Sequence, residues 1–361
     1  QDHLSEVWLS DLEDIDDLSE QNLPDDKAAR FLKAIKDFKD SRMIKTLSSE
    51  GTERLNATMP LLMREVLKPE YSEESLKRVL SVIESIAKRS VYLVLLKENP
   101  DSLAHLVKLC DVSAWLTEML VKYPALLDQL LDESALYAPL EASALQQEAR
   151  ALLDSLGQDE EAFMDQIRQW RHAQVFKVAA ADITGHLPVI KVSDYLTWIA
   201  EAVLNTVVEF SWRMQQQRSG LPGGMSEENK RNPFMVLGYG KLGGIELGYG
   251  SDLDIVFVYE GLNSSDQAVG PNGKSLDNAI YFVRMGQKII SLMTTLMPSG
   301  TLYEVDTRLR PNGTSGMMVV DFAGYKSYLE NKAWVWEHQA LVRVRPVVGD
   351  AQSVAAFTEF K

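Results

Sequence analysis

The sequence has little of several features that would each define a class of protein. Cys110 is the only cysteine among 361 residues, so no disulfide can form within the chain. A lone cysteine is typical of a reducing compartment, and we expect a cytoplasmic protein. The longest apolar runs, such as Val91 to Leu96, are far shorter than the roughly 20 residues of a membrane span. The first residues lack the basic and then apolar order of a secretory signal, so no membrane partner is expected.

Positive charge is also scarce. Lysine and arginine number 37 against 52 aspartates and glutamates, which gives a formal net charge of −15. Such a surface repels nucleic acid, so we expect no polynucleotide partner. The remaining composition, 45% hydrophobic and 25% charged, is that of an ordinary globular protein. Because the chain opens without methionine and stops at Lys361 after an apolar-rich stretch, we expect a fragment of something longer.

Two familiar phosphate-binding motifs are missing. No Walker A sequence occurs, and Gly238, Gly240 and Gly243 match the dinucleotide fingerprint only formally. That fingerprint requires a helix that opens at the third glycine and crosses over to a parallel strand. Only nine residues, from Gly244 to Asp252, lead to the next strand, and a crossover needs about a dozen. We therefore reject a Rossmann fold.

The chain changes character near its middle. Apolar residues recur at helical spacing from Asp26 to about Arg218, whereas short β-rich runs follow at Phe234 to Gly238, Leu253 to Tyr259, Leu302 to Val305 and Met317 to Val320. A helix is expected from Leu276 to Met297. The pattern predicts an α+β fold. Two parts are expected: a helical linker or regulatory region at 1–160 and a catalytic domain at 161–361. We expect the catalytic domain to begin with a helical lead-in at 161–218 and a mobile glycine-rich loop at 219–233. A catalytic sheet at 234–320 and a helical segment at 321–361 would follow.

Two aspartates at the start of the second strand carry the first chemical signal. Strand side chains alternate in direction, so Asp252 and Asp254 point the same way. Two adjacent carboxylates before an apolar run repel each other unless water or a cation relieves them. An Asp-x-Asp pair alone is more often a solvated turn than a metal site. The glycine turn upstream of this pair offers backbone N–H groups to phosphate oxygens.

A third carboxylate changes the balance between these interpretations. Asp306 lies with Glu304 and Arg308 on one face of a later predicted strand, again within apolar surroundings, and charged residues at such positions are seldom structural. Carboxylates on two strands together with a glycine turn are the parts needed for two-metal nucleotidyl transfer. We therefore predict that Asp252, Asp254 and Asp306 bind Mg²⁺.

The same residues resemble a known superfamily. Gly240-Lys241, ten residues, Asp252-Leu253-Asp254 and the later Asp306 are similar to the DNA polymerase β-type nucleotidyltransferases, although many of those have Gly or Ser where Lys241 stands. The longer strings that begin at Gly238, Glu246, Tyr303 and Trp336 resemble glutamine synthetase adenylyltransferases, and the details favour the AMP-attaching C-terminal half of that family. The resemblance spans roughly residues 89–349, and the first 80 residues are the least defined.

The resemblance implies a polymerase β-like domain with a mixed β-sheet flanked by helices. It implies transfer of AMP from ATP to a tyrosine hydroxyl of glutamine synthetase, with release of pyrophosphate. Asp252, Asp254 and Asp306 would be both catalytic and metal-binding. The nucleotide would be bound by two sets of residues, the turn residues Gly240, Lys241 and Ser251 and the arginines Arg308 and Arg310.

Other functions stay open at this point. The chain could instead be the phosphorolytic half that removes AMP, a small-molecule nucleotidyltransferase of the antibiotic-modifying kind, or a non-catalytic regulatory module that binds nucleotide. The family resemblance further implies control by glutamine and by the PII signalling protein, without indicating where either would bind.

Overall fold

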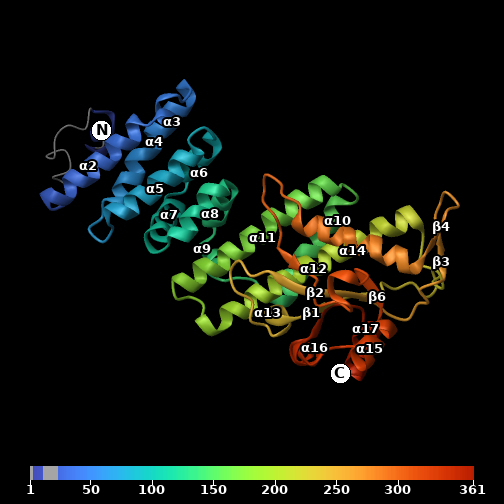
Figure 1. Cartoon of the computed structure of the whole chain (residues 1–361). Helices are drawn as coiled ribbons and strands as arrows, with labels where there is room; N and C mark the ends of the chain where they lie inside the picture. Colours follow the sequence, from blue (N-terminus) through green and yellow to red (C-terminus); the bar gives the residue numbers. More distant parts are fainter. Residues whose placement is uncertain (1–2, 11–22) are drawn as a thin grey trace. The chain divides into compact units, whose positions relative to one another are not determined.

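The computed structural model describes residues 3–10 and 23–361 (Figure 1). The chain forms two compact units: one of residues 1–139 and 176–188, the other of residues 140–175 and 189–361. Among the described residues, no helix is both long enough and apolar enough to cross a membrane. The predicted fold class, α+β, is confirmed.

The first unit is helical, as its apolar periodicity predicts. Serines at the N-caps of several helices accept backbone N–H bonds, as Ser48 does from Gly51 and Ser113 from Leu116, and so set where these helices begin. Pro100 opens one helix and Pro124 another, as proline favours the first position of a helix. The elements are α1 (His3–Leu9), α2 (Asp25–Asp40), α3 (Arg42–Lys45), α4 (Ser49–Val66), α5 (Glu73–Ile86), α6 (Ser90–Glu98), α7 (Pro100–Val112), α8 (Ala114–Lys122), η2 (Pro124–Leu131) and α9 (Glu133–Leu136), with the second half of α11 (Glu160–Ile183).

The second unit contains the sheet. Its helices are α10 (Ala142–Leu156), the first half of α11, α12 (Val189–Ser219), α13 (Gly240–Gly243), α14 (Asn278–Thr294), η3 (Gly313–Ser315), α15 (Phe322–Asn331), α16 (Val335–Ala340), η4 (Leu341–Arg343) and α17 (Ala351–Phe360). Its strands are β1 (Phe234–Gly238), β2 (Leu253–Tyr259), β3 (Gln267–Val269), β4 (Ser275–Asp277), β5 (Val305–Asp306), β6 (Val319–Asp321) and β7 (Arg345–Val348).

The main sheet is mixed and centres on β2. The strand order is β5-β2-β1-β7, with β6 also paired to β2. Strand β1 runs antiparallel to β2 and to β7, whereas β5 and β6 run parallel to β2. The antiparallel β1–β2 pair confirms that no Rossmann crossover follows the glycine turn.

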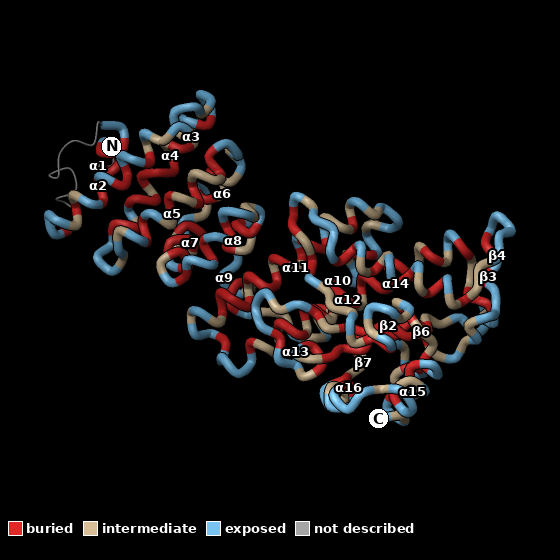
Figure 2. The backbone as a smooth tube through the Cα atoms, viewed as in Figure 1, coloured by how far each residue is buried: buried red, intermediate tan, exposed pale blue. Residues whose placement is uncertain are grey.

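Helices cover both faces of the sheet, which explains why β1 and β2 are apolar almost throughout. One face packs under α15 and α17, in a core of Met235, Leu237, Tyr239, Val256, Val258, Phe322, Tyr325, Leu329, Val344 and Phe357. On the other face Phe234 and Phe257 lie 5.4 Å apart by ring centroid, and Tyr259 stacks on Phe282 of α14 at 4.2 Å. The buried sheet in Figure 2 is thus the rigid layer on which the site stands.

Several elements differ from expectation. Strands β1 and β2 begin and end where predicted, but the third and fourth strands are shorter and lie later, at Val305–Asp306 and Val319–Asp321. Residues 321–361, expected to be helical, contribute β7, whose Pro346 is tolerated because this is an edge strand. The β3–β4 hairpin and the single turn α13 were not predicted, since both are short and polar or rich in glycine.

The glycine-rich loop is anchored at two points. Tyr281 donates its hydroxyl to the carbonyl of Gly220 at 2.9 Å, and the buried Asn278 side chain bonds both the N–H and the carbonyl of Gly223. The loop's first part is therefore fixed to α14 in this structure. The predicted functional boundary near residue 160 stays a prediction. The compact units divide elsewhere, with α10 packed on α12 inside the sheet unit.

A buried arginine ties α11 to the segment that leads into β5. Arg168 is fully buried and donates to the carbonyls of Leu292 at 2.8 Å, Thr295 at 2.7 Å and Gly300 at 2.7 Å. His172, one helical turn later, bonds the carbonyl of Ser299 at 2.8 Å. These bonds satisfy carbonyls at the end of α14 and beyond it, and so fix the approach to the strand that carries Asp306.

We expect Arg168→Met to destabilise the protein by about 3 kcal/mol, because it leaves several buried carbonyls without a donor. Thermal unfolding of the two proteins measures this. The exposed neighbour, as Gln169→Met, is the matched control and should leave the melting temperature within about a degree of the parent protein. An Arg168→Met protein as stable as its parent would show that these carbonyls find other donors.

Candidate metal and nucleotide site

Three carboxylates meet at the start of the central strand. Asp254 on β2 is the direct register partner of Asp306 on β5, so the pairing of the two strands places both side chains on one face. Asp252 stands just before β2 and is exposed. One carboxylate oxygen from each of the three lies within 4.8 Å of the others. Among the described residues this is the only group of three or more His, Cys, Asp or Glu close enough to share a metal ion.

The environment of the three carboxylates is electrostatically uneven. Burial raises the pKa of Asp254, and the charges of Asp252 and Asp306 raise it further. The pKa of Asp306 is lowered, chiefly because Arg308 donates to its side chain, with Nε 2.9 and 3.0 Å from the two carboxylate oxygens. Oxygen donors held this close in a partly buried place fit a hard divalent cation such as Mg²⁺.

The glycine turn lies directly against this cluster. Gly240 has φ +53°, and a Cβ added there would stand 2.6 Å from Oδ2 of Asp254. Tyr239 donates its N–H to the carbonyl of Asp254 at 2.8 Å, which fastens the turn to β2. The pKa of Asp254 is raised overall, and the positive charge of the exposed Lys241 offsets a small part of that rise. Only glycine therefore fits at position 240, for both its conformation and its lack of a side chain.

The remaining predicted nucleotide-binding residues are placed differently from one another. Arg308 lies beyond the end of β5, and its exposed guanidinium is bonded to Asp306. Arg310 is buried, and its guanidinium donates to the carbonyls of Thr307, Thr314 and Gly316 within its own loop. The hydroxyl of Ser251 accepts the N–H of Gly248 at 3.0 Å, beside the cluster. Arg308 is thus beside the carboxylates, whereas Arg310 stabilises the loop that follows them.

One supporting residue is not among the predicted site residues. Arg345 on β7 donates to the carbonyls of Leu242 at 3.1 Å and Gly243 at 3.3 Å, and it pairs with Glu201 of α12. It therefore fixes the last turn of α13. No local sequence pattern predicts this contact, because Arg345 and the turn are about a hundred positions apart in the sequence.

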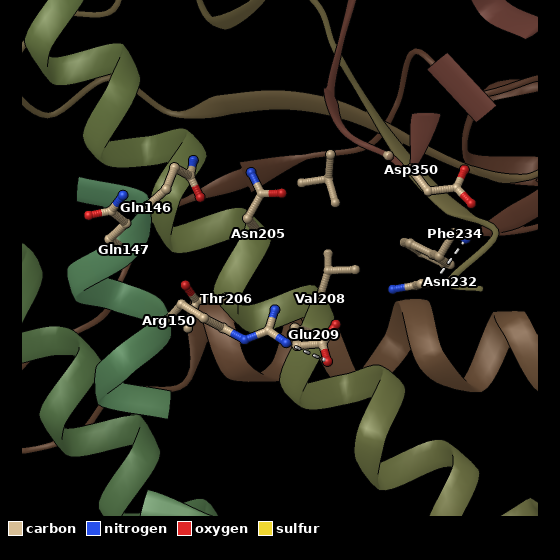
Figure 3. Close-up of a pocket in the computed structure, with 12 residues that line it drawn as sticks. Gln146, Gln147, Arg150, Asn205, Thr206, Val208, Glu209, Asn232, Phe234 and Asp350 are labelled. Atoms are coloured by element: carbon tan, nitrogen blue, oxygen red, sulfur yellow. Dashed lines mark hydrogen bonds and ion pairs between the residues drawn. The ribbon is translucent and has the colours of Figure 1, made fainter. Parts of the chain in front are cut away.

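A separate hollow of about 440 Å³ lies between α10, α12 and the ends of β1 and β7 (Figure 3). Its charged groups are already paired: Arg150 with Glu209 at 3.3 Å, and Asp350 with Arg231 at 3.0 Å. None of the three clustered aspartates lines it. This hollow is therefore distinct from the carboxylate site.

A mixed sheet that brings three carboxylates together beside a glycine turn matches the class that the motifs resemble, the nucleotidyltransferases of the DNA polymerase β type. Residues 103–360 match the family model described as glutamate-ammonia ligase adenylyltransferase. With that match covering well over half of its length, the chain belongs to this family.

Individual relatives agree with the family match. The bifunctional glutamine synthetase adenylyltransferase/adenylyl-removing enzyme of Thioalkalivibrio sulfidiphilus is 46% identical over 336 residues, which are 92% of this chain and 34% of that protein. Its namesake in Pseudomonas putida is 44% identical over 331 residues, 91% of this chain and 34% of that protein. The one in Nitrosococcus oceani is 42% identical over 366 residues, 99% of this chain and 37% of that protein. The chain thus spans about a third of the length of these curated relatives.

We expect Gly240→Ala to weaken Mg²⁺ binding more than the same substitution at another glycine with a positive φ. A side chain in this left-handed conformation costs roughly 1–2 kcal/mol, and here the added carbon also meets Asp254 at 2.6 Å. Gly273→Ala is the matched control, because Gly273 has φ +75° and nothing within 4 Å of an added Cβ. Titration with Mg²⁺, followed by the rise in melting temperature, should show weakened binding for Gly240→Ala only. Equal binding in both variants would contradict the close approach.

We expect Asp254→Asn to stabilise the metal-free protein slightly, by about 1–3 °C in melting temperature. The pKa of Asp254 is raised in the folded state, so the ionised carboxylate opposes folding. This cost is absent at low pH and grows as the pH rises above the ordinary aspartate value of 3.8. The gain from Asp254→Asn should therefore be larger at pH 7 than at pH 4.

The same variant should lose the stabilisation that Mg²⁺ gives to the parent protein at pH 7. Thermal unfolding with and without Mg²⁺ at both pH values makes the comparison. A variant that is less stable than its parent without metal, at either pH, would contradict the electrostatic account.

Proposed function

We propose that the chain transfers AMP from ATP to a tyrosine hydroxyl of glutamine synthetase and releases pyrophosphate. The tyrosine oxygen attacks the α-phosphorus, the bond from that phosphorus to the β-bridging oxygen breaks, and the tyrosine proton leaves to solvent. The observation that carries the proposal is the convergence of three carboxylates within 4.8 Å beside Gly240. The names of the relatives supply the substrate protein.

Asp252, Asp254 and Asp306 would hold Mg²⁺. When bound, Mg²⁺ supplies charge neutralisation for the triphosphate and makes the α-phosphorus more open to attack. The raised pKa of Asp254 supports a cation-binding role, because a site that disfavours its own ionised carboxylate is relieved by a cation. Gly240 and Lys241 would contact phosphate oxygens beside Asp254, and the closeness of Gly240 to Asp254 supports this role.

The lowered pKa of Asp306 bears on how the tyrosine loses its proton. Ordinary tyrosine and aspartate pKa values already differ by about six. Arg308 widens that gap by stabilising the Asp306 carboxylate, so Asp306 is a poor base for a phenol. Asp306 is better suited to remain ionised as a ligand. Arg308 would favour the developing phenolate by its own charge.

The attaching reaction is preferred over the removing one because two sequence strings resemble the attaching half of the family: Glu246-Leu-Gly-Tyr249 and the string from Trp334 to Gln339 that contains Trp336. Since the chain spans only about a third of its relatives, the activity of the piece is itself part of the proposal. Control by glutamine and by the PII protein remains an implication of the family resemblance.

The test incubates the chain with Mg²⁺, ATP labelled at the α-phosphate and unmodified glutamine synthetase. We expect label on a tyrosine of the target. Asp252→Asn, Asp254→Asn and Asp306→Asn should each lower the rate on the order of 100-fold or more. Asp277→Asn removes a carboxylate that instead bonds Gln267 in the β3–β4 hairpin and should keep at least half of the parent rate.

Each alternative gives its own result in this assay. Release of ADP from modified glutamine synthetase in the presence of phosphate, without label transfer, would assign the chain to AMP removal. Binding of ATP with no turnover on either form would favour a regulatory module. Near-parent transfer by any of the three aspartate variants with an intact fold would refute the assignment of the carboxylates.

A further inference from the structure

A groove of about 480 Å³ opens beside the carboxylate cluster. It is bordered by the turn after β5, by η3, by the end of α15 and by α16, and its lining includes Arg308, Tyr328, Lys332, Trp334, Trp336 and Glu337. Arg308 also binds Asp306, so one side chain joins the groove to the cluster. The groove and the carboxylate cluster are therefore adjacent.

The rim of the groove exposes large apolar side chains. Trp334 is 71% exposed, Val335 75% and Trp336 53%, all on the single short helix α16 and its N-cap. Figure 2 draws α16 mainly in the colour of exposed residues. Two tryptophans left in water within the first turn of one helix are costly unless a partner covers them, and tryptophan and arginine are the residues most enriched at the energetic centres of protein interfaces.

The base of the groove is rigid. The buried carboxylate of Glu337 accepts the hydroxyl of Tyr328 at 2.9 and 3.1 Å and the N–H of Trp334 at 2.7 Å. These bonds fasten α16 to α15, so the tryptophans are presented on a fixed support. Preorganised aromatic side chains bind with a smaller loss of conformational entropy.

The lining of the groove has cations in a protein of net charge −15. The carboxylate of Glu337 is buried and used within the base, and Arg308 is paired with Asp306, which leaves the exposed Lys332 as the lining cation outside the cluster. A groove with exposed tryptophans and cations is complementary to an aromatic segment that carries acidic residues.

The order of strands indicates which reactant this groove receives. Strand β2 carries Asp254; β1, which leads into the glycine turn, pairs with one edge of β2, whereas β5, which carries Asp306, pairs with the other. Phosphate oxygens belong with the glycine turn and Lys241. The groove adjoins Asp306 and Arg308 at the other edge of β2. With the triphosphate at the glycine turn, as proposed above, this edge is the side from which the acceptor would approach.

We infer that this groove docks the acceptor segment of the protein substrate: a surface loop that carries the target tyrosine with acidic residues beside it. The inference rests on the proposed adenylyl transfer and adds where and by what chemistry the protein acceptor is held. Trp334 and Trp336 contact the segment's apolar and aromatic side chains, Lys332 attracts its carboxylates, and Arg308 lies where the tyrosine hydroxyl meets the cluster.

The experiment compares the parent chain with Trp334→Ala/Trp336→Ala and with Lys332→Glu. Two quantities are measured for each: the KM for glutamine synthetase in AMP transfer at saturating MgATP, and the direct binding of glutamine synthetase without nucleotide. We expect the double variant to raise the KM and weaken binding about tenfold or more, as loss of interface tryptophans does. Lys332→Glu should do so more at low salt than at high salt. The KM for MgATP should stay within twofold in both.

Matched controls remove similar groups elsewhere. Leu296→Ala takes away a side chain that is 78% exposed, and Lys274→Glu reverses an exposed lysine in the turn between β3 and β4. Both should behave as the parent. Trp336→Phe with Trp334 intact should keep most of the binding, since it retains an aromatic face. Equal melting temperatures across the set would exclude loss of folding.

The outcomes separate this inference from the proposed function. If the parent binds glutamine synthetase and transfers no AMP, the proposed function fails, yet weakened binding by the double variant still supports the groove. Parent-like KM and binding in both variants overturn the inference while leaving the function intact. A raised KM for MgATP with unchanged binding of glutamine synthetase also overturns it, because the groove would then hold the nucleotide. A parent that neither binds nor transfers overturns both.

Discussion

The mutual repulsion of three carboxylates held within 4.8 Å is the constraint on which the site depends. No flexible loop would keep like charges together, because it would separate them into water. Here the pairing of β5 with β2 sets Asp306 against Asp254, and both strands rest on a core closed by helices on each face. The stability of that core is what maintains an arrangement that is unfavourable by itself.

The carboxylates of the cluster differ in their electrostatic surroundings. Arg308 already satisfies Asp306, whose pKa falls, while Asp254 is partly buried between two anions and its pKa rises. The cluster thus has one carboxylate that is stable as an anion and one that a cation would relieve most. The same support reaches back to α11, since Arg168 fixes the segment that delivers β5 to its place beside β2.

How far sequence predicts this protein depends on whether a feature is local. Strands β1 and β2 were predicted with their observed bounds because each is a short, mostly apolar run next to glycines or aspartates. Strands β5, β6 and β7 are short, and pairing with distant partners decides where they begin and end. The cluster of Asp252, Asp254 and Asp306 could be predicted, because side chains alternate in direction along the two predicted strands. The groove could not, because its lining comes from four segments, and the exposure of Trp334 and Trp336 depends on how those segments pack.

The turn that closes α13 shows strain next to the site. The N–H of Ile245 donates to the carbonyl of Leu242, and the N–H of Glu246 donates to the carbonyl of Lys241. These are the two hydrogen bonds of a turn that ends a helix, and the left-handed position of such a turn is usually glycine. Ile245 takes that position with φ 57°, which for a β-branched residue costs at least roughly 1–2 kcal/mol. The conformation persists because the turn is held from both sides: Arg345 binds its carbonyls, and Tyr239 bonds its start to β2. A turn held so firmly keeps the backbone at Gly240 in one position beside Asp254, and a fixed backbone is what the proposed recognition of a phosphate at this turn would require.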